Sequence, residues 1–310
     1  MRFLARVASR AGALAVVFLG VTFIIYLAVF ALPGDPIRAL AGDKPLDPAT
    51  VATLRAAYHL DAPVWQQYLT YLGGLFHGDL GTDFTGRAVG SLMASRWPVT
   101  IALALTAWAL EIVVGLAIGV VQALTKGTAV DHGLLAVTVL TSCVPIFVLG
   151  VLVQQFFGVG LGWLPVAGVR AGWPTSYIMP AAVIAIFGLS AVSRLMRGAM
   201  IDNLGADYVR SARAKGFGPG RVVGLHVLRN SLIPASTYLA TDLGYLLGGT
   251  VVIEGIFNLP GIGNLLFDAI RTHEGPTVVG VSTALILIFL LTSVGVDIIH
   301  VGLDPRLRRA

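Results

Sequence analysis

The chain has 310 residues, of which 56% are hydrophobic and only 12% are charged, and its formal net charge is +5. Soluble domains carry about 25% charged residues, so this composition excludes an ordinary soluble protein and indicates several membrane spans. In a membrane protein, basic residues mark cytoplasmic loops and contacts with anionic headgroups. We therefore expect membrane lipid as a partner and no nucleic acid.

The first apolar segment follows Arg2, Arg6 and Arg10 and is uncharged from Ala11 to Gly34. It is longer than the hydrophobic region of a signal peptide, which has about 7–15 residues. It reaches the roughly 20 residues that a bilayer requires. We therefore expect an uncleaved first transmembrane helix.

Six apolar segments are long enough to cross a bilayer, and each is expected to be helical because no water there satisfies the backbone. They are approximately 11–32, 98–122, 133–157, 176–193, 232–253 and 278–300. The fold class expected is an all-α integral membrane protein with six transmembrane helices. Pro145 lies inside the third segment and predicts a kink, which could line a cavity or improve packing.

The distribution of Lys and Arg predicts that both termini are cytoplasmic. With that orientation, 14 of the 21 basic residues fall on the inside, and 5 of the others fall in the long loop after the first span. Charge has little influence on topology in so long a loop. Two regions follow: 1–96, the first helix with a long extracytoplasmic loop, and 97–310, a five-helix core with a cytoplasmic loop at about 194–231.

The long outer loop is expected to be partly helical. Asp47 followed by Pro48 is typical of a helix start, and the segment WQQYLTYLGGLFHGDLGTDF is amphipathic with an aromatic face. Such a segment could lie in the membrane interface, cover the neighbouring helices or form a docking surface.

The chain lacks the motifs of known catalytic chemistry. No Gly-Lys pair occurs, so a phosphate-binding P-loop is excluded, and no GxSxG or HExxH motif is present. The six histidines are scattered, and the one cysteine, Cys143, lies in an apolar run. We predict no catalytic residue, no metal site and no cofactor bound by this chain.

Two acidic residues lie inside expected spans, Glu111 in the second and Asp242 in the fifth. A carboxylate at that depth costs about 3 kcal/mol unless it faces protein or water. The two acids either line a polar pathway that favours a cationic group, or are held neutral or hydrogen-bonded between helices. Glu111, Asp242 and Pro145 are therefore the candidate pathway residues.

The inner loop carries the most basic run of the chain. Met200, Leu204, Tyr208 and Ala212 recur every four residues and predict one helical face. The GFGPG turn at 216–220 ends the helix, and RVVGLHVLRN begins another. This helix–turn–helix could lie on anionic lipid or project into a partner protein, and the compact glycine turn favours the second.

The segments DYVRSARAKG and HVLRNSLIP resemble the cytoplasmic loop of ABC importer permeases. In the general importer motif, Glu-Ala-Ala precedes a glycine. Aligned on Gly216, this chain has Arg210, Ser211 and Ala212 there, so only the last alanine and the glycine match. The dipeptide, oligopeptide and nickel permease branch shares that departure. Similar segments cover nearly the whole chain: PGDP at 33–36, HGDLGTDF at 77–84, LGWLPVAG at 161–168, IEGIFNLPGIGNLL at 253–266 and LDPRLRR at 303–309.

The resemblance, to the first permease of the pair, implies a type I ABC importer permease fold in the bacterial cytoplasmic (inner) membrane. It implies half of a translocation pathway for di- or oligopeptides or similar small solutes. The implied partners are a second homologous permease, two ATPase subunits that use ATP and Mg, and an extracytoplasmic substrate-binding protein. The residues that it implies for ATPase coupling are Tyr208, Arg210, Ser211, Ala212, Arg213, Lys215 and Gly216.

Asp242 departs from the neutral polar residue, often Gln, that the resemblance leads us to expect, and it predicts a preference for cationic cargo. The alternative function is a proton-coupled secondary transporter that works without ATPase subunits, with Glu111 and Asp242 as its proton relay. A third interpretation is a membrane-embedded enzyme or scaffold without transport.

Overall fold

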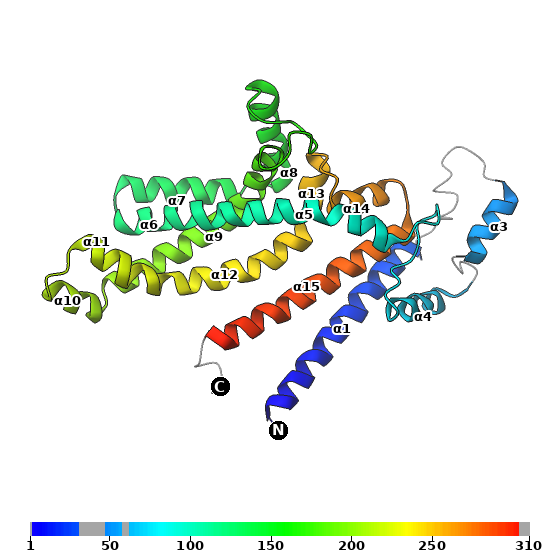
Figure 1. Cartoon of the computed structure of the whole chain (residues 1–310), viewed down its shortest axis with the longest axis horizontal. Helices are drawn as coiled ribbons and strands as arrows, with labels where there is room; N and C mark the ends of the chain where they lie inside the picture. Colours follow the sequence, from blue (N-terminus) through cyan, green and yellow to red (C-terminus); the bar gives the residue numbers. More distant parts are fainter. Residues whose placement is uncertain (1, 31–46, 58–61, 304–310) are drawn as a thin grey trace. The chain divides into compact units, whose positions relative to one another are not determined.

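The structure is a computed structural model that describes residues 2–30, 47–57 and 62–303. Within those ranges the chain is helical apart from turns, loops and one isolated β-bridge between Thr82 and Ala88. The chain divides into two compact units (Figure 1). Unit 1 comprises Met1–Thr100 and Pro260–Leu291, and unit 2 comprises Ile101–Leu259 and Thr292–Ala310.

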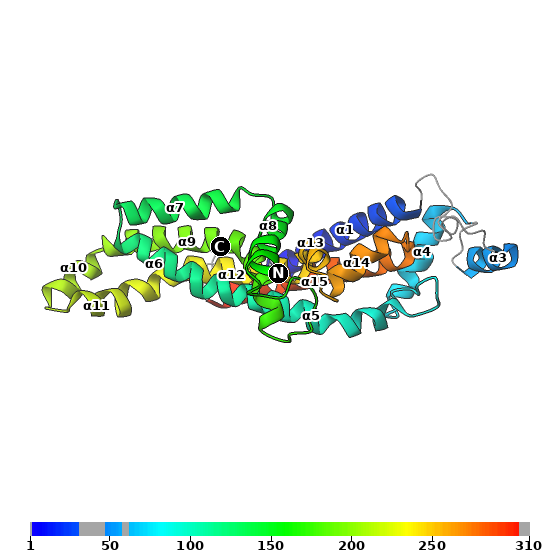
Figure 2. The same ribbon diagram turned by 90° about the horizontal axis from the view of Figure 1, so that it is seen from above.

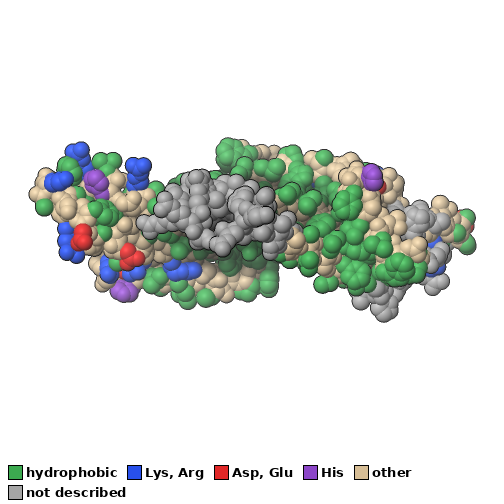
Figure 3. Space-filling model, turned by 90° about the horizontal axis from the view of Figure 1, so that it is seen from below, with side chains coloured by type: hydrophobic (Ala, Val, Ile, Leu, Met, Phe, Trp, Pro, Cys, Tyr) green, Lys and Arg blue, Asp and Glu red, His purple; other side chains and the backbone are tan. Residues whose placement is uncertain are grey.

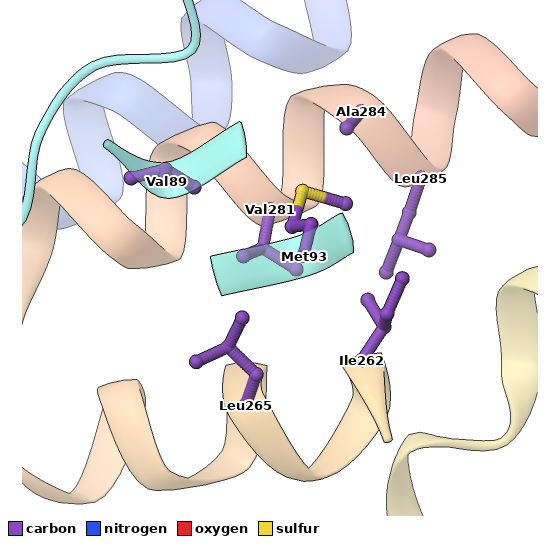
Figure 4. Close-up of a cluster of buried hydrophobic side chains, with 7 residues drawn as sticks. All are labelled: Val89, Met93, Ile262, Leu265, Val281, Ala284 and Leu285. Carbon is purple, nitrogen blue, oxygen red and sulfur yellow. The ribbon is translucent and has the colours of Figure 1, made fainter. Parts of the chain in front are cut away.

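Unit 1 is built from helices near the two ends of the chain. These are α1 (Arg2–Phe30), α3 (Pro48–Ala57), α4 (Val64–Leu75), the start of α5 (Val89–Leu110), α14 (Ile262–Arg271) and most of α15 (Gly275–Leu303). Figure 4 shows a core cluster in which side chains of α5, α14 and α15 point toward one another. Its members are Val89, Met93, Ile262, Leu265, Val281, Ala284 and Leu285.

Helix α4 packs against α1 through aromatic side chains. The Tyr68 hydroxyl lies 2.8 Å from the Thr22 hydroxyl and donates to the Leu19 carbonyl at 3.0 Å. The Phe23 and Tyr68 rings are 5.1 Å apart. The outer-loop helices expected after Asp47 and over the WQQYLTYLGG segment are thus present as α3 and α4.

A buried aspartate organises the turn before α5. Asp83 accepts hydrogen bonds from the backbone N–H of Thr85 at 3.0 Å and of Arg87 at 2.8 Å, and from the Arg87 guanidinium at 2.8 Å. Burial by itself raises the pKa of the Asp83 carboxyl, but the hydrogen bonds from Thr85 and Arg87 hold it below its usual value. This turn directs the chain from the segment after α4 into α5.

Unit 2 contains the rest of α5, the end of α15 and, among the described residues, eleven further elements, which are arranged around one central helix, α9. They are η1 (Glu111–Gly115), α6 (Leu116–Leu124), α7 (Ala129–Ser142), α8 (Ile146–Val153), η2 (Gln154–Gly160), α9 (Thr175–Leu204), α10 (Asp207–Ala214), α11 (Pro219–Arg221), η3 (Val222–Val227), α12 (Leu228–Gly249) and α13 (Val251–Ile256). Helix α9 packs against α6, α7 and α12 (Figure 2). At Gly119 of α6, an added Cβ would approach Met196 Cβ to 2.7 Å, so a small residue permits close helix packing there.

Four described helices are long and apolar enough to cross a membrane: Gly12–Phe30, Val89–Leu124, Thr175–Leu204 and Gly275–Gly295. The pair Ala129–Ser142 and Ile146–Gly160, bent by 104°, makes a fifth if it is counted as one span. The expected fifth span, 232–253, is helical as α12 and α13 but is not among them. Its helix α12 carries Arg229, Asn230 and Asp242.

The structure changes the expected limits of three spans. Helix α5 begins at Val89 rather than near 98, and α9 continues to Leu204 rather than ending near 193. The third expected span is broken rather than kinked, with Pro145 as the N-cap of α8. Because proline has no N–H and disfavours helical geometry in the preceding residue, α7 ends before it and α8 starts after it.

Candidate functional site: an inner tip and a polar membrane helix

The basic loop folds into a compact projection formed by α10, α11 and the turn between them, which we call the inner tip. Gly216 lies in that turn with φ of +82°, a conformation that favours glycine. Its N–H donates to the Arg213 carbonyl at 2.9 Å, and the Phe217 N–H donates to the Ala212 carbonyl at 3.3 Å. These bonds close the end of α10. The expected glycine turn and restart of the helix are both present.

The buried face of α10 is carried by Val209 and Ala212, which are 0% and 6% exposed. They pack in a cluster with Met200, Val222 and Val227. The predicted face that included Tyr208 is wrong at that residue, which is 38% exposed. Because α9 ends at Leu204 and α10 begins at Asp207, the four-residue repeat does not continue from one helix into the next.

The outer face of the inner tip is basic. Arg210, Arg213 and Lys215 are exposed, as is Ser211. The Arg210–Asp207 ion pair, 3.5 Å long and exposed on both sides, contributes little to stability. Figure 3 shows Lys and Arg side chains gathered at the end of unit 2 formed by α10 and α11. The tip therefore presents a small, positively charged surface on a compact turn.

A chain of hydrogen bonds joins the inner tip to both neighbouring helices. The Tyr208 hydroxyl donates to Asn203 Oδ1 at 2.7 Å, and Asn203 Nδ2 donates to Ser231 Oγ at 3.0 Å. Ser231 Oγ donates in turn to the Val227 carbonyl at 2.8 Å. Sequence analysis identified Tyr208 but missed Asn203 and Ser231, because no periodicity pairs polar residues on different helices.

A second link, also missed, connects α7 to α9. Arg197 Nε and Nη2 donate to the two carboxylate oxygens of Asp131 at 2.8 and 2.7 Å. Asp131 is 1% exposed and also accepts from the Gly127 N–H at 3.0 Å. A bidentate pair of this kind is strong and directional, so it fixes the position of α7 along α9.

The structure brings Glu111 and Asp242 together within unit 2. Glu111 is 1% exposed at the start of η1, and it interacts electrostatically with the Asp242 carboxyl. Within the described residues, Glu111 Oε2 and Asp242 Oδ2 are buried without a hydrogen-bond partner. A Cβ at Gly188 of α9 would collide with the Glu111 carboxyl. Two neighbouring carboxyl groups repel each other when both are ionised.

Helix α12 exposes mainly polar side chains in spite of its membrane length. Ser236, Thr237, Thr241 and Tyr245 are exposed, and Asp242 is partly exposed. No water is available in the hydrocarbon core for such groups. Such a face is unsuited to contact with lipid.

Between α9 and α12, towards the inner tip, lies an open groove of about 430 Å³. Its polar lining is Arg194, Asp202 and Asn203 from α9 and Asn230 from α12. Arg194 is exposed, and its guanidinium donates to the Ser190 hydroxyl at 2.5 Å.

Pro145, the third candidate pathway residue, lies at the break between α7 and α8. Within the described residues, no group of His, Cys, Asp and Glu could hold a metal ion.

Comparison with protein families identifies this arrangement. Residues 112–309 match the family described as "Binding-protein-dependent transport system inner membrane component". Residues 1–104 match the family described as "Binding-prot-dependent transport system membrane comp, N-term". Together the two matches include the inner tip, Asp242 and helices α3 and α4, and Glu111 lies in the short gap between them.

Curated relatives align along nearly their whole length. The chain is 36% identical over 329 residues to the di/tripeptide transport system permease protein DppB of Pseudomonas aeruginosa, covering 97% of this chain and 98% of the relative. It is 39% identical over 299 residues to a putative peptide transport system permease protein of Brucella abortus, covering 94% and 95%. It is 35% identical over 289 residues to the glutathione transport system permease protein GsiC of Salmonella choleraesuis, covering 93% and 94%.

Two solved structures share the fold at low identity. The MetNI methionine ABC transporter, in inward-facing conformations, matches with a TM-score of 0.53 and 17% identity, covering 69% of this chain and 96% of that chain. An amino acid ABC transporter matches with a TM-score of 0.50 and 14% identity, covering 68% and 93%. The family match, the full-length relatives and the shared fold lead to one conclusion: this chain belongs to the binding-protein-dependent transport permeases and is a membrane subunit of an ABC importer, not itself an ATPase.

Proposed function

We propose that this chain forms half of the translocation pathway of an ATP-driven importer of short peptides in the bacterial cytoplasmic membrane. The observation that carries the cargo class is the 36% identity to a di/tripeptide permease across 98% of that relative. The glutathione permease among the relatives supports a cargo of similar size. In this proposal α12 is the fifth of six spans, and both termini are cytoplasmic.

The second half of the pathway is a homologous permease, which covers the polar face of α12. A helix with exposed Thr237, Thr241 and Tyr245 is unsuited to lipid and suited to a wet channel shared with a partner. An extracytoplasmic binding protein delivers the cargo, and two ATPase subunits bind ATP and Mg on the cytoplasmic side.

The ATPases dock on the inner tip. Arg210, Ser211, Arg213 and Lys215 form its exposed face, Ala212 anchors it and Gly216 keeps the turn compact. Movement of the tip is passed on by Tyr208, because its hydroxyl is connected through Asn203 to Ser231 on α12. ATP-driven closure of the ATPases thereby moves α9 and α12 together.

The two acids have different tasks in this pathway. Asp242, which is partly exposed, faces the cargo and favours a cationic group. Glu111 is buried and interacts electrostatically with the Asp242 carboxyl. Pro145 shapes the wall by turning α8 away from the direction of α7.

The Gly216→Trp variant tests the docking of the ATPases. A Cβ at Gly216 meets nothing within 4 Å, but the positive φ and the large side chain are incompatible with a compact turn. We expect the variant to remain in the membrane with its partner permease, to lose the ATPases in a detergent pull-down and to lose peptide uptake. Gly133→Ala, on α7 with nothing within 4 Å, is the control.

Normal uptake by Gly216→Trp would show that the tip is not the docking site. Wild-type uptake that stops with an uncoupler at constant ATP would instead favour the proton-coupled transporter.

A further inference from the structure

Two arginines on α9, three residues apart, have opposite surroundings. Arg197 is engaged by both carboxylate oxygens of Asp131. Arg194 has no acidic partner within the described residues; its guanidinium donates to a neutral hydroxyl, that of Ser190. Arg194 is exposed and lines the groove between α9 and α12. One arginine fixes the fold, and the other has unused donors in an open cavity.

Arg194 shares its groove with a carboxylate, that of Asp202. The groove thus holds one guanidinium and one carboxylate. A zwitterion presents the complementary pattern, a carboxylate and an ammonium group.

The chemistry of the groove favours a peptide over a lipid headgroup. Asp202 repels a headgroup that is only anionic, but it attracts the ammonium group of a zwitterionic peptide. Asn203 and Asn230 offer amide donors and acceptors, which suit a peptide backbone. The volume of about 430 Å³ falls within the range of small-molecule sites, about 300–1,000 Å³.

We propose that Arg194 recognises the C-terminal carboxylate of the cargo on the cytoplasmic side of the pathway. The planar guanidinium binds a carboxylate through two parallel hydrogen bonds, which lysine cannot reproduce. This inference rests on the proposed function, because it assumes that the cargo is a short peptide. It adds a residue that selects for a free carboxylate.

The test must avoid selection by the binding protein, which acts from the outside. Proteoliposomes carrying the complete transporter are therefore loaded on the cytoplasmic side with dialanine or its C-terminal amide. Uptake of labelled dialanine from the binding-protein side is then measured as a function of the internal peptide concentration. Internal peptide that occupies the groove inhibits uptake, so the ratio of the two inhibitory concentrations reports on carboxylate recognition.

We expect wild type to be inhibited by internal dialanine at about tenfold lower concentration than by the amide, as for a charge-assisted hydrogen bond. Arg194→Gln should abolish this preference, and Arg194→Lys should retain only part of it. Arg170→Gln, which removes an exposed arginine from the loop before α9, is the matched control and should behave as wild type.

An unchanged preference in Arg194→Gln would overturn the proposal, and so would an equal loss of inhibition by both peptides. If Arg194→Gln does not assemble, Arg194→Lys decides, and a full wild-type preference in that variant would overturn the proposal. A wild-type transporter that takes up no dialanine would contradict the proposed function itself, whatever Arg194 does.

Discussion

Helices α1 and α12 are both long enough to cross a membrane, yet they expose opposite kinds of side chain. The exposed residues of α1 are apolar, with Val16 at 71% and Ile24 at 64%, and its Thr22 is buried against Tyr68. The exposed residues of α12 are mainly polar, with Tyr245 at 60% and Thr237 and Thr241 beside it. The surface of α1 is suited to lipid, whereas the surface of α12 is suited to water or protein.

The largest effect is expected from placing the same acid on both helices. Val17→Asp adds a carboxylate to the exposed apolar face of α1 and should disfavour insertion by about 3 kcal/mol. Thr241→Asp, on the exposed polar face of α12, should insert as wild type. The measurement is the fraction of each variant that resists alkaline extraction from membranes. Equal loss for both variants would show that α12 also faces lipid.

A second prediction compares glycines that have different neighbours. At Gly188 of α9 a side chain would displace the Glu111 carboxyl, whereas at Gly20 of α1 an added Cβ meets nothing within 4 Å. Gly188→Leu should therefore destabilise the folded chain by about 2–3 kcal/mol, as overpacking does, and Gly20→Leu should leave it unchanged. Thermal unfolding in detergent measures both. A Gly188→Leu variant as stable as wild type would mean that Glu111 does not pack against α9.

The smallest effect concerns the charge on α12. Asp242→Asn keeps the shape of the side chain but removes the charge, so uptake of a cationic dipeptide relative to a neutral one should fall about fivefold, equivalent to about 1 kcal/mol. Asp268→Asn, on the exposed face of α14, is the control for loss of one acid. The same uptake ratio in wild type and Asp242→Asn would end the assignment of cationic preference to this residue.

Much of the inner tip could be predicted from the sequence. The GFGPG motif predicts a turn, and Gly216 adopts there a positive φ that few other residues adopt. The register of α10 could not be predicted, because a short break at Gly205 and Ala206 restarts the helical phase and puts Val209 rather than Tyr208 in the core. Hydrophobic periodicity assumes one continuous helix, so it does not reveal a two-residue interruption between two helices.

Sequence patterns could not predict the side-chain hydrogen bonds between helices. Arg194 and Arg197 look equivalent in the sequence, and only the position of Asp131, 66 residues away, distinguishes them. The same holds for Asn203 and Ser231, which are 28 residues apart.

The sequence by itself determined that the chain enters the membrane, where its apolar helices lie and which loop is basic, because these properties depend on composition over a short window. The tertiary structure decided which polar groups meet: Glu111 with Asp242, Asp131 with Arg197, and Tyr208 with Asn203 and Ser231. The physical reason is that a buried polar group is stable only beside a suitable partner, and packing between distant helices supplies that partner.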